Sequence, residues 1–164
     1  MISIHAMKTT KVQAVLVSVN GVGVLIRGPA GSGKSMAALN LMRHGHPLVG
    51  DDLVEIVSDT GAGLIGRGVE PDVRIEVRGL GIYRAASLFP AGTVSQASID
   101  LVVDLDVYDP AGDEGRTSPE TTVTHLLDKD LIAVRVPVAS GVDPSLLIEL
   151  LAHLYKQRGT VEPS

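Results

Sequence analysis

A glycine-rich stretch that ends in lysine and serine has the clearest chemical meaning in this sequence. Residues Gly28-Pro29-Ala30-Gly31-Ser32-Gly33-Lys34-Ser35 fit the pattern Gly-x-x-x-x-Gly-Lys-Ser/Thr. In such a loop, backbone N–H groups turn toward a phosphate, the lysine adds a full positive charge, and the serine hydroxyl is a ligand for Mg²⁺. The alternative is a glycine-rich turn without a ligand. The stretch predicts a loop that binds the phosphates of a nucleotide.

Two adjacent carboxylates, Asp51 and Asp52, follow a short apolar stretch downstream of this loop. Neighbouring residues of an extended backbone point to opposite sides, so we expect the two side chains to do different jobs. Phosphoryl transfer needs a metal ligand and a group that takes the proton of the attacking oxygen. A solvated Asp-Asp turn is the alternative. The phosphate loop just upstream favours the catalytic interpretation.

The segments around the glycine-rich stretch have the polarity of a strand and a helix. Val24–Ile26 is a short apolar run of the type that forms a buried strand. Apolar residues then recur at roughly helical spacing until Gly45, at Met36, Leu39, Leu41 and Met42. A strand, a glycine-rich turn and a helix start distinguish a phosphate loop from a chance match. We therefore expect a helix over Ser35–His44.

Hairpins outnumber helices in the rest of the predicted structure. The alternating stretch Val12–Val19 leads into Asn20-Gly21, which predicts an antiparallel hairpin with the strand at Val22–Ile26. A second hairpin is expected around Asp59–Gly63. Further strands are expected at 47–49, 53–57, 64–65, at the start of 75–82, and at 99–107 and 131–138. This pattern predicts one α/β phosphate-loop domain over residues 1–164, with a mixed sheet, hairpins and few helices.

The C-terminal part contains a predicted loop and a second predicted helix. Tyr108–Pro119 is rich in Asp, Glu, Gly and Pro, as is typical of a mobile loop. Asp143 as cap and Pro144 at the first position predict a helix that runs to about Arg158, before Gly159. Its leucines form one stripe that we expect to face the core, at Leu146, Leu147, Leu150, Leu151 and Leu154.

Composition argues against several other classes of protein. The 164 residues are 45% hydrophobic, which is enough for the core of one domain. A net charge of −5, with only three tyrosines and one phenylalanine, argues against a nucleic-acid partner. The absence of cysteine excludes disulfides, Cys-type zinc sites and thiol catalysis.

No apolar run is long enough to span a membrane, and the first residues lack the apolar core of a signal peptide. We therefore expect a cytoplasmic protein without a membrane partner. Residues 1–6, which precede Met7, are either a cloning remnant or an upstream start.

Three segments together resemble the HPr kinase/phosphorylase family. They are Gly28–Ser35, Leu48-Val49-Gly50-Asp51-Asp52 and Ile75-Glu76-Val77-Arg78-Gly79-Leu80-Gly81-Ile82. The third is the most specific, because phosphate loops occur in many families. The similarity covers roughly residues 12–142, the catalytic domain of the family, without the family's separate N-terminal domain. It implies a kinase that uses ATP and Mg²⁺ to phosphorylate a serine on an HPr-like phosphocarrier protein, and it implies a homohexamer.

The resemblance also implies roles for single residues. Lys34 would contact the β- and γ-phosphates, and Ser35 would hold Mg²⁺. Asp52 would be the general base toward the substrate serine, with Asp51 beside it. The family's loop arginine, which acts on the transferred phosphate, is best matched by Arg116 after a small gap.

The signature segment adds a metal ligand. Glu76 would help to hold Mg²⁺, and residues 78–82 would shape the site. Without the resemblance, Glu76 and Arg78 lie on one side of a strand and are equally well explained as an ion pair.

The sequence also departs from the family. Gln13 stands where the family has its active-site histidine, and glutamine does not titrate. The family's basic stretch near the C-terminus is replaced by Pro137–Val142, where Ala139 and Val142 occupy the positions of the two basic side chains. Pro90 stands where glycine is usual. We therefore predict a kinase with weak or absent phosphorylase activity.

Two other functions stay open. One is a paralogous kinase that acts on a different acceptor, and the other is a nucleotide-binding sensor without turnover. The retained carboxylates Asp51, Asp52 and Glu76 favour turnover, since a sensor has no need of a base.

Overall fold

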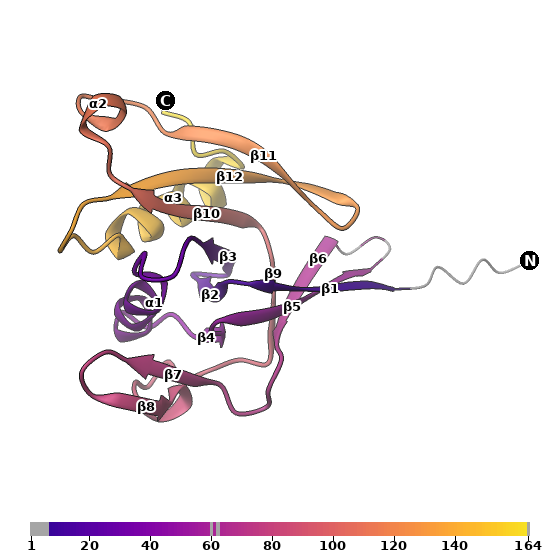
Figure 1. Cartoon of the computed structure of the whole chain (residues 1–164). Helices are drawn as coiled ribbons and strands as arrows, with labels where there is room; N and C mark the ends of the chain where they lie inside the picture. The colour runs from indigo at the N-terminus through magenta and orange to yellow at the C-terminus, as the bar shows by residue number, and fades with distance from the viewer. Residues whose placement is uncertain (1–6, 60, 62, 164) are drawn as a thin grey trace, which may run out of the picture.

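A six-stranded mixed sheet forms the centre of the computed structural model, which describes residues 7–59, 61 and 63–163 (Figure 1). Its strand order is β11-β12-β10-β3-β2-β4. The strands are β2 (Val15–Val19), β3 (Val22–Arg27), β4 (Leu48–Gly50), β10 (Leu101–Val107), β11 (Glu120–Leu126) and β12 (Lys129–Val138). The hairpin predicted at Asn20-Gly21 is confirmed, because β2 and β3 pair antiparallel around it.

Four strands of this sheet run in the same direction. Strands β10 and β12 pair in parallel, and β10 also pairs in parallel with β3. Strand β4 runs antiparallel to β2, which is itself antiparallel to β3, so β4 points the same way as β3. The carboxyl ends of β3, β4, β10 and β12 therefore lie at one edge of the sheet. The predicted mixed α/β fold with hairpins and few helices is confirmed.

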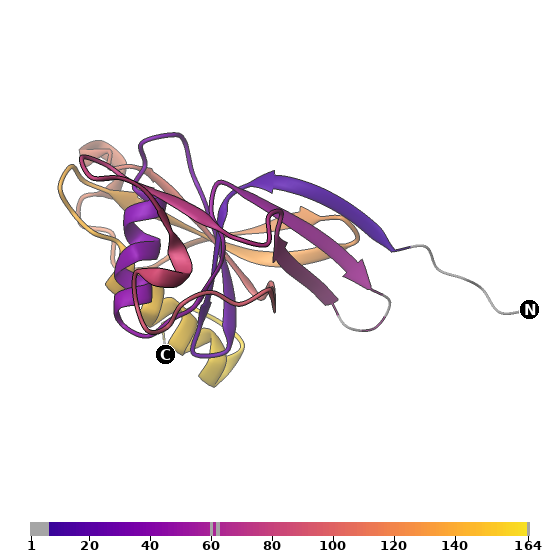
Figure 2. The same cartoon turned by 90° about the horizontal axis from the view of Figure 1, so that it is seen from below.

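A second, four-stranded sheet covers one face of the first and extends away from it (Figure 2). Its order is β1-β5-β6-β9, with β1 (Lys8–Gln13), β5 (Leu53–Asp59), β6 (Gly63–Gly68) and β9 (Gln96–Ser98). The predicted hairpin that joins β5 to β6 is antiparallel, although positions 60 and 62 of its turn lie outside the described residues. A separate hairpin is formed by β7 (Arg74–Val77) and β8 (Gly81–Arg84).

The prediction of one continuous strand over Val12–Val19 is wrong. The chain changes sheets at Ala14, whose N–H donates to the carbonyl oxygen of Asp52 at 3.1 Å. Strand β1 pairs with β5, whereas β2 pairs with β3 and β4. Ala14 to Val17 form an unbroken apolar run that is buried at every position, and no glycine or proline marks the crossing, so the sequence pattern does not reveal it.

Helices cover the other face of the central sheet. They are α1 (Lys34–Arg43) and α3 (Ser145–Arg158), with a short α2 (Pro110–Asp113) and a 3-10 turn η1 (Ala85–Ser87) elsewhere. Helix α1 packs on β2, α3 packs on β3 and β10, and the two helices touch each other. Alternate residues of one strand point to opposite faces, so Val24 and Ile26 join the core under the helices and Leu25 joins the core between the sheets.

The predicted core face of α3 is wrong for three of its five leucines, whereas Leu151 packs against the core and Leu154 is half-buried. Leu146, Leu147 and Leu150 are 64%, 47% and 49% exposed, while the buried residues of the helix are Ser145, Ile148 and Ala152. The small side chains of Ser145 and Ala152 let the helix backbone lie close to its neighbours, which turns the leucines toward solvent. The helix begins at Ser145 rather than Pro144, and the Asp143 carboxylate still accepts a hydrogen bond from the Ser145 N–H at 3.0 Å.

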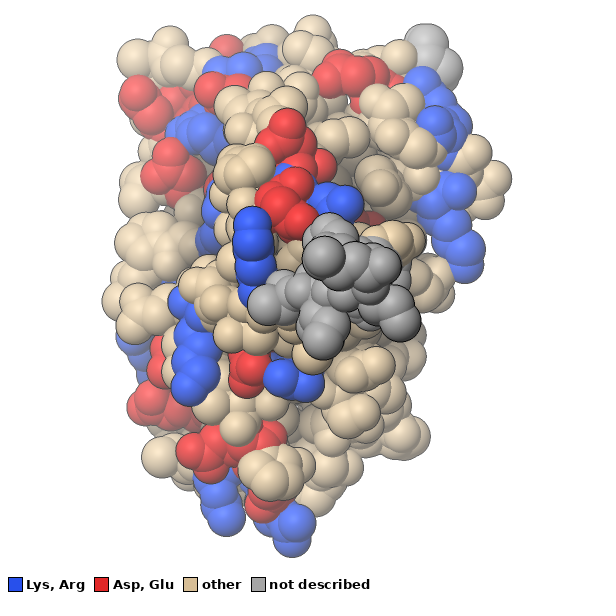
Figure 3. Space-filling model, turned by 90° about the vertical axis from the view of Figure 1, so that its right-hand side faces the viewer, with Lys and Arg blue, Asp and Glu red and all other residues tan. Residues whose placement is uncertain are grey.

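Basic and acidic side chains lie interspersed on the face that Figure 3 shows, which is the right-hand side of the molecule in Figure 1. In the part of the chain that the structure describes, no helix combines the length and apolarity that crossing a bilayer requires.

Candidate active site

The phosphate loop lies at the edge where the parallel strands end (Figure 1). It connects the end of β3 to the start of α1, and Asp51-Asp52 follow the end of β4. Loops after parallel strands meet at the carboxyl edge of a sheet, which is where α/β proteins bind their ligands. The fold therefore brings the phosphate loop and Asp51-Asp52 to the same edge of the sheet. Strand β2 lies between β3, which precedes the loop, and β4, which precedes the two aspartates.

Backbone geometry explains the glycines of the loop. Gly33 caps α1 with φ = +98°, a left-handed conformation that disfavours side chains. A Cβ at Gly28 would lie 2.7 Å from the carbonyl oxygen of Leu105, so the loop passes too close to β10 for a larger residue. The hydroxyl of Ser32 is buried and has no hydrogen-bond partner among the described residues. An unpaired buried donor in a loop at a helix N-terminus fits an anionic ligand with several acceptor oxygens.

The ammonium group of Lys34 is hydrogen-bonded to the backbone of the phosphate loop. Its Nζ donates to the carbonyl oxygens of Gly28 at 2.6 Å and Pro29 at 3.1 Å. Lys34 also lines a cavity of about 310 Å³, together with Ser35, Asp51 and Asp52. We call this the inner cavity. A single lysine at the mouth of such a loop is suited to bind phosphate oxygens as a point charge.

Ser35 and Asp51 form a hydrogen-bonded pair in the inner cavity. The Ser35 hydroxyl donates to Oδ1 of Asp51 at 2.9 Å. Burial raises the pKa of Asp51 above its ordinary value, and the neighbouring charge of Asp52 adds to this, whereas the Ser35 hydrogen bond and Lys34 oppose it. A hydroxyl and a carboxylate held together are oxygen ligands of the type that Mg²⁺ prefers. Among the described residues, no cluster of three or more His, Cys, Asp or Glu offers a separate metal site.

Asp52 occupies an unusual backbone conformation. Its φ is +68°, in the left-handed region that non-glycine residues rarely adopt. The conformation is held by two hydrogen bonds, from the Ala14 N–H to the carbonyl of Asp52 and from the Leu53 N–H to the carbonyl of Asp51 at 2.8 Å. Backbone strain of this type concentrates at functional sites, where it fixes the direction of a side chain. Asp51 accepts the Ser35 hydrogen bond, and Asp52 adopts this strained backbone, while the different roles of the two carboxylates stay a prediction.

The hairpin of β7 and β8 supplies the opposite wall of the inner cavity. Glu76 and Arg78 both line it. The ion pairs of this hairpin involve Asp72, with Arg84 at 3.0 Å and Arg74 at 3.8 Å, and the described residues show no ion pair between Glu76 and Arg78. The ion-pair alternative is therefore not observed among the described residues, and the role of Glu76 as a metal ligand stays a prediction.

Arg116 lies outside the inner cavity. Its guanidinium pairs with Asp113 at 3.7 Å and Glu120 at 3.5 Å, and it donates to the carbonyl oxygen of Gly112 at 3.2 Å. The segment predicted as a mobile loop contains α2, and Arg135 holds Asp113 at 2.7 Å. That hydrogen bond also lowers the pKa of Asp113 below its ordinary value. The role of Arg116 in catalysis stays a prediction, and it requires Arg116 to exchange these partners for a phosphate.

Gln13 lies next to the carboxylate pair. It ends β1 and is exposed, and its partner on β5 is Leu53, the residue after Asp52. The position at which the sequence departs from the family is therefore adjacent to the candidate base.

A second cavity was not predicted from the sequence. It measures about 460 Å³ and lies on the other side of the phosphate loop, where the loop after β12 faces α1. We call this the outer cavity. The signal that points to it is the parallel pairing of β3, β10 and β12, which no local pattern reveals.

The fold places the phosphate-loop motif at the carboxyl edge of its parallel strands, and the inner cavity lies between this loop, Asp51-Asp52 and the β7–β8 hairpin. The family described as HPr Serine kinase C-terminal domain matches residues 5–162. The chain belongs to this family, as its three motif segments predicted.

Relatives and a solved structure agree with that assignment. The chain is 42% identical over 150 residues to an HPr kinase/phosphorylase of Geobacillus sp. (strain WCH70), covering 90% of this chain and 48% of the relative. It is 38% identical over 155 residues to an HPr kinase/phosphorylase of Geobacter sulfurreducens, covering 92% of this chain and 49% of the relative. The chain thus spans about half the length of the curated relatives it matches. The structure of the Hpr(Ser) kinase/phosphatase from Coxiella burnetii superposes with a TM-score of 0.78 at 26% identity, covering 92% of each chain.

Proposed function

We propose that this chain is an ATP- and Mg²⁺-dependent protein serine kinase whose acceptor is an HPr-like phosphocarrier protein. The observation that carries the proposal is the inner cavity, which places Asp52, on a strained backbone, beside Lys34 and the Ser35–Asp51 pair. The names of the relatives support the acceptor, and the match to the family described as HPr Serine kinase C-terminal domain supports the kinase domain.

Each residue then has a role in the forward reaction. The phosphate loop and Lys34 bind the β- and γ-phosphates of ATP, while Ser35 and Asp51, with Glu76, hold Mg²⁺. The bound Mg²⁺ neutralises charge on the phosphate oxygens. Asp52 accepts the proton of the serine hydroxyl as its oxygen bonds to the γ-phosphorus and the bond to the β-phosphate oxygen breaks. The products are phosphoserine and ADP.

The acceptor has a second opening through which to reach Asp52. Both Asp51 and Asp52 also line a cavity of about 320 Å³ on the side away from the phosphate loop, together with Glu70 and Arg74. A serine that enters there faces Asp52 while ATP occupies the loop. The role of Arg116, contact with the transferred phosphate, requires the α2 segment to move toward the loop.

The resemblance supports three further proposals. The enzyme works as a homohexamer, residues 1–164 act as a single catalytic domain, and the site of action is the cytoplasm. The alternative of a nucleotide-binding sensor without turnover predicts ATP binding with no phosphate transfer to any acceptor.

The test is a transfer assay with ATP, Mg²⁺ and a purified HPr-like protein, read out by intact-protein mass spectrometry. The matched control is the same acceptor with its target serine changed to alanine. We expect one phosphate on the wild-type acceptor and none on the alanine variant. Binding of ATP without transfer to the carrier or to other serine proteins would support the sensor instead.

A further inference from the structure

Arg135 on β12 is bound by three carboxylates from neighbouring elements. Its guanidinium donates to Asp113 at 2.7 Å, to Asp106 at 2.8 Å and to Glu120 at 3.1 Å. These acceptors belong to α2, β10 and β11. Hydrogen bonds between charged groups are roughly twice as strong as those between neutral groups. One side chain therefore ties the short helix α2 to the edge of the central sheet.

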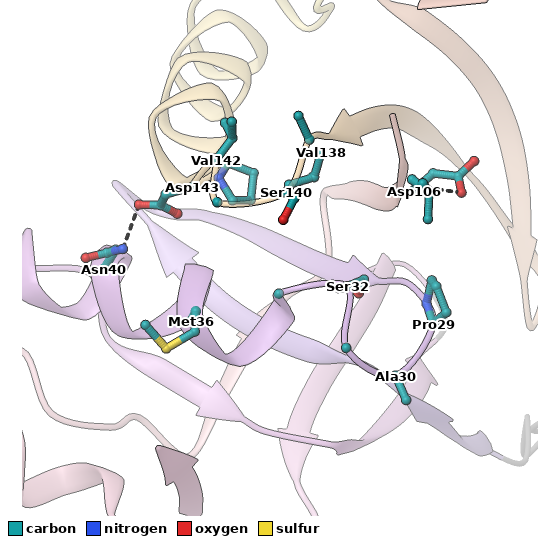
Figure 4. A pocket seen from close by; sticks show the side chains of 16 residues that line it. Pro29, Ala30, Ser32, Met36, Asn40, Asp106, Val138, Ser140, Val142 and Asp143 are labelled. Carbon is teal, nitrogen blue, oxygen red and sulfur yellow. Dashed lines mark hydrogen bonds between the residues drawn. The ribbon is translucent and has the colours of Figure 1, made fainter. Parts of the chain in front are cut away.

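The cluster around Arg135 lies beside a cavity that opens onto the phosphate loop. Asp104 is the direct cross-strand partner of Arg135 on β10, but Arg27 holds that carboxylate through hydrogen bonds of 2.7 and 2.9 Å. Arg135 instead pairs with Asp106, two residues further along β10. Asp106 and Pro29 of the phosphate loop both line the outer cavity (Figure 4).

The same cluster holds Arg116, which the family resemblance assigns to the transferred phosphate. Arg116 lies 3.7 Å from Asp113 and 3.5 Å from Glu120, and it donates to the carbonyl oxygen of Gly112 at 3.2 Å. Asp113 and Gly112 belong to α2 and move with it. The pair with Glu120 contributes little, because that carboxylate is 41% exposed. Among the side-chain ion pairs of the described residues, the pair of Arg135 with Asp113 therefore holds α2 in place most strongly.

We propose that Arg135 is a positioning residue that holds α2 in a resting position and thereby keeps Arg116 away from the phosphate loop. The proposal rests on the role proposed above for Arg116, which requires the α2 segment to move. We call the Arg135–Asp113 pair the latch. Asp113 is 2% exposed and also accepts the N–H of Asp109 at 2.8 Å. Opening the latch leaves a buried charge without its partner, so the open state is the minor one, and its population limits the forward rate.

The experiment opens the latch with Arg135→Met, which keeps an apolar stem and removes the charge. Asp113 then gains by turning to solvent, which releases α2. We expect the peptide that covers residues 109–116 to exchange its amide hydrogens about tenfold or more faster than in the wild type, measured by mass spectrometry. The single-turnover rate of transfer to the carrier protein, with ATP saturating, should rise by about threefold or more, while the affinity for ATP stays within about twofold.

Three further variants show whether the effect passes through Arg116. Arg135→Lys keeps a charge beside Asp113 and should restore most of the wild-type exchange and rate. Arg67→Met breaks an arginine–carboxylate pair on the second sheet, with Glu55 at 2.8 Å, and should change neither quantity. In an Arg116→Met background, Arg135→Met should still speed exchange but no longer raise the rate, because the side chain that the latch restrains is absent.

Several results would overturn the latch. They are unchanged exchange in Arg135→Met, faster exchange with an unchanged or lower rate, and an equal rise in rate when Arg116 is absent. Each of these leaves the proposed kinase function intact, whereas a wild type that transfers no phosphate refutes that function and the latch with it. If Arg135→Met does not fold, as judged by its melting curve, Asp113→Asn breaks the same pair from the other side and is judged by the same outcomes.

Discussion

The two cavities beside the phosphate loop share four residues of that loop and α1 but differ in almost every other respect. The inner cavity contains Lys34, Asp51, Asp52, Glu76 and Arg78, and its backbone is strained at Asp52. Of the two carboxylates of the outer cavity, Asp106 pairs with Arg135, and Asp143 accepts hydrogen bonds from the uncharged Asn40 amide and Ser145 hydroxyl. The difference favours the inner cavity, where five charged side chains line one space, as the place where we predict phosphoryl transfer. The loop itself lines both cavities.

The largest effect should come from the base in the inner cavity. Asp52→Asn removes the proton acceptor but keeps the shape of the side chain and its left-handed backbone, which asparagine also tolerates. We expect phosphate transfer to fall by roughly 10²–10⁴-fold, with the affinity for ATP nearly unchanged. The measurements are single-turnover transfer to the carrier protein and calorimetric binding of ATP.

Asp130→Asn is the matched control, since Asp130 is an exposed aspartate that pairs only with His125. It should transfer phosphate at the wild-type rate. Wild-type transfer by Asp52→Asn would contradict the assignment of the base, and Asp51 would then be the next residue to change.

The phosphate loop should show the second-largest effect, and it should appear in binding. Lys34→Ala removes a charge-assisted contact worth on the order of 1.5–3 kcal/mol, which corresponds to roughly 10- to 150-fold in affinity for ATP. Tripolyphosphate should weaken in parallel, because Lys34 serves the phosphates and not the nucleoside. Lys11→Ala, an exposed lysine on β1, is the control. Equal affinities of Lys34→Ala and the wild type for ATP would exclude a phosphate-binding role for this loop.

The inner cavity was largely predictable from the sequence, and the outer cavity was not. The glycines, Lys34 and Ser35 form a continuous motif whose strand–turn–helix context is local, and the adjacent Asp51 and Asp52 follow a short apolar stretch. The outer cavity depends on the parallel pairing of β10 with β3 and β12, between residues about eighty and thirty positions apart. Such pairings leave no local sequence signal.

The two wrong predictions, the continuous strand over Val12–Val19 and the core face of α3, also arise from tertiary packing that leaves no local sequence signal. An apolar run continues from Ala14 to Val17 although the chain changes sheets at Ala14, because β2 is buried on both faces. The leucines of α3 form a stripe at helical spacing, but Ile148 and the small residues beside it make the contact with the core. Sequence periodicity identified the elements, and tertiary packing decided which faces are buried.

The reverse reaction tests the replacement of the family's histidine by Gln13 and of its two basic side chains by Ala139 and Val142. Attack of inorganic phosphate on phosphoserine needs a proton donor for the leaving serine. It also needs a cationic side chain that binds the attacking phosphate. Gln13 cannot supply the proton, and Ala139 and Val142 carry no charge. We expect release of pyrophosphate from the phosphorylated carrier to be slow compared with forward transfer.

Gln13→His restores a titratable group one residue away, across the β1–β5 pairing, from the segment that holds Asp52. It should raise the reverse rate by about tenfold or more and leave the forward rate nearly unchanged. Lys11→His places a histidine on the same strand, two residues earlier, and should have no such effect. Fast pyrophosphate release by the wild-type chain would contradict the prediction.

The smallest effect concerns the stability of the inner cavity. Because burial raises the pKa of Asp51, the folded chain holds this proton more tightly than the unfolded chain does. The contribution of Asp51 to stability is therefore fully present below its ordinary pKa of 3.8 and is lost as the pH rises through the raised value. At neutral pH the ionised carboxylate destabilises the fold, and Asp51→Asn removes this cost while its amide oxygen can still accept the Ser35 hydrogen bond. We expect Asp51→Asn to melt above the wild type at pH 7, by on the order of a few degrees, and the difference to shrink as the pH is lowered toward 4.

Melting curves without ligand at a series of pH values measure this, with Asp130→Asn as the exposed control. A melting temperature of Asp51→Asn at or below that of the wild type at pH 7 would show that the charge of Asp51 is already compensated by Ser35 and Lys34, and the contrast in unpaired charge between the two cavities would then rest on Asp52 and Glu76.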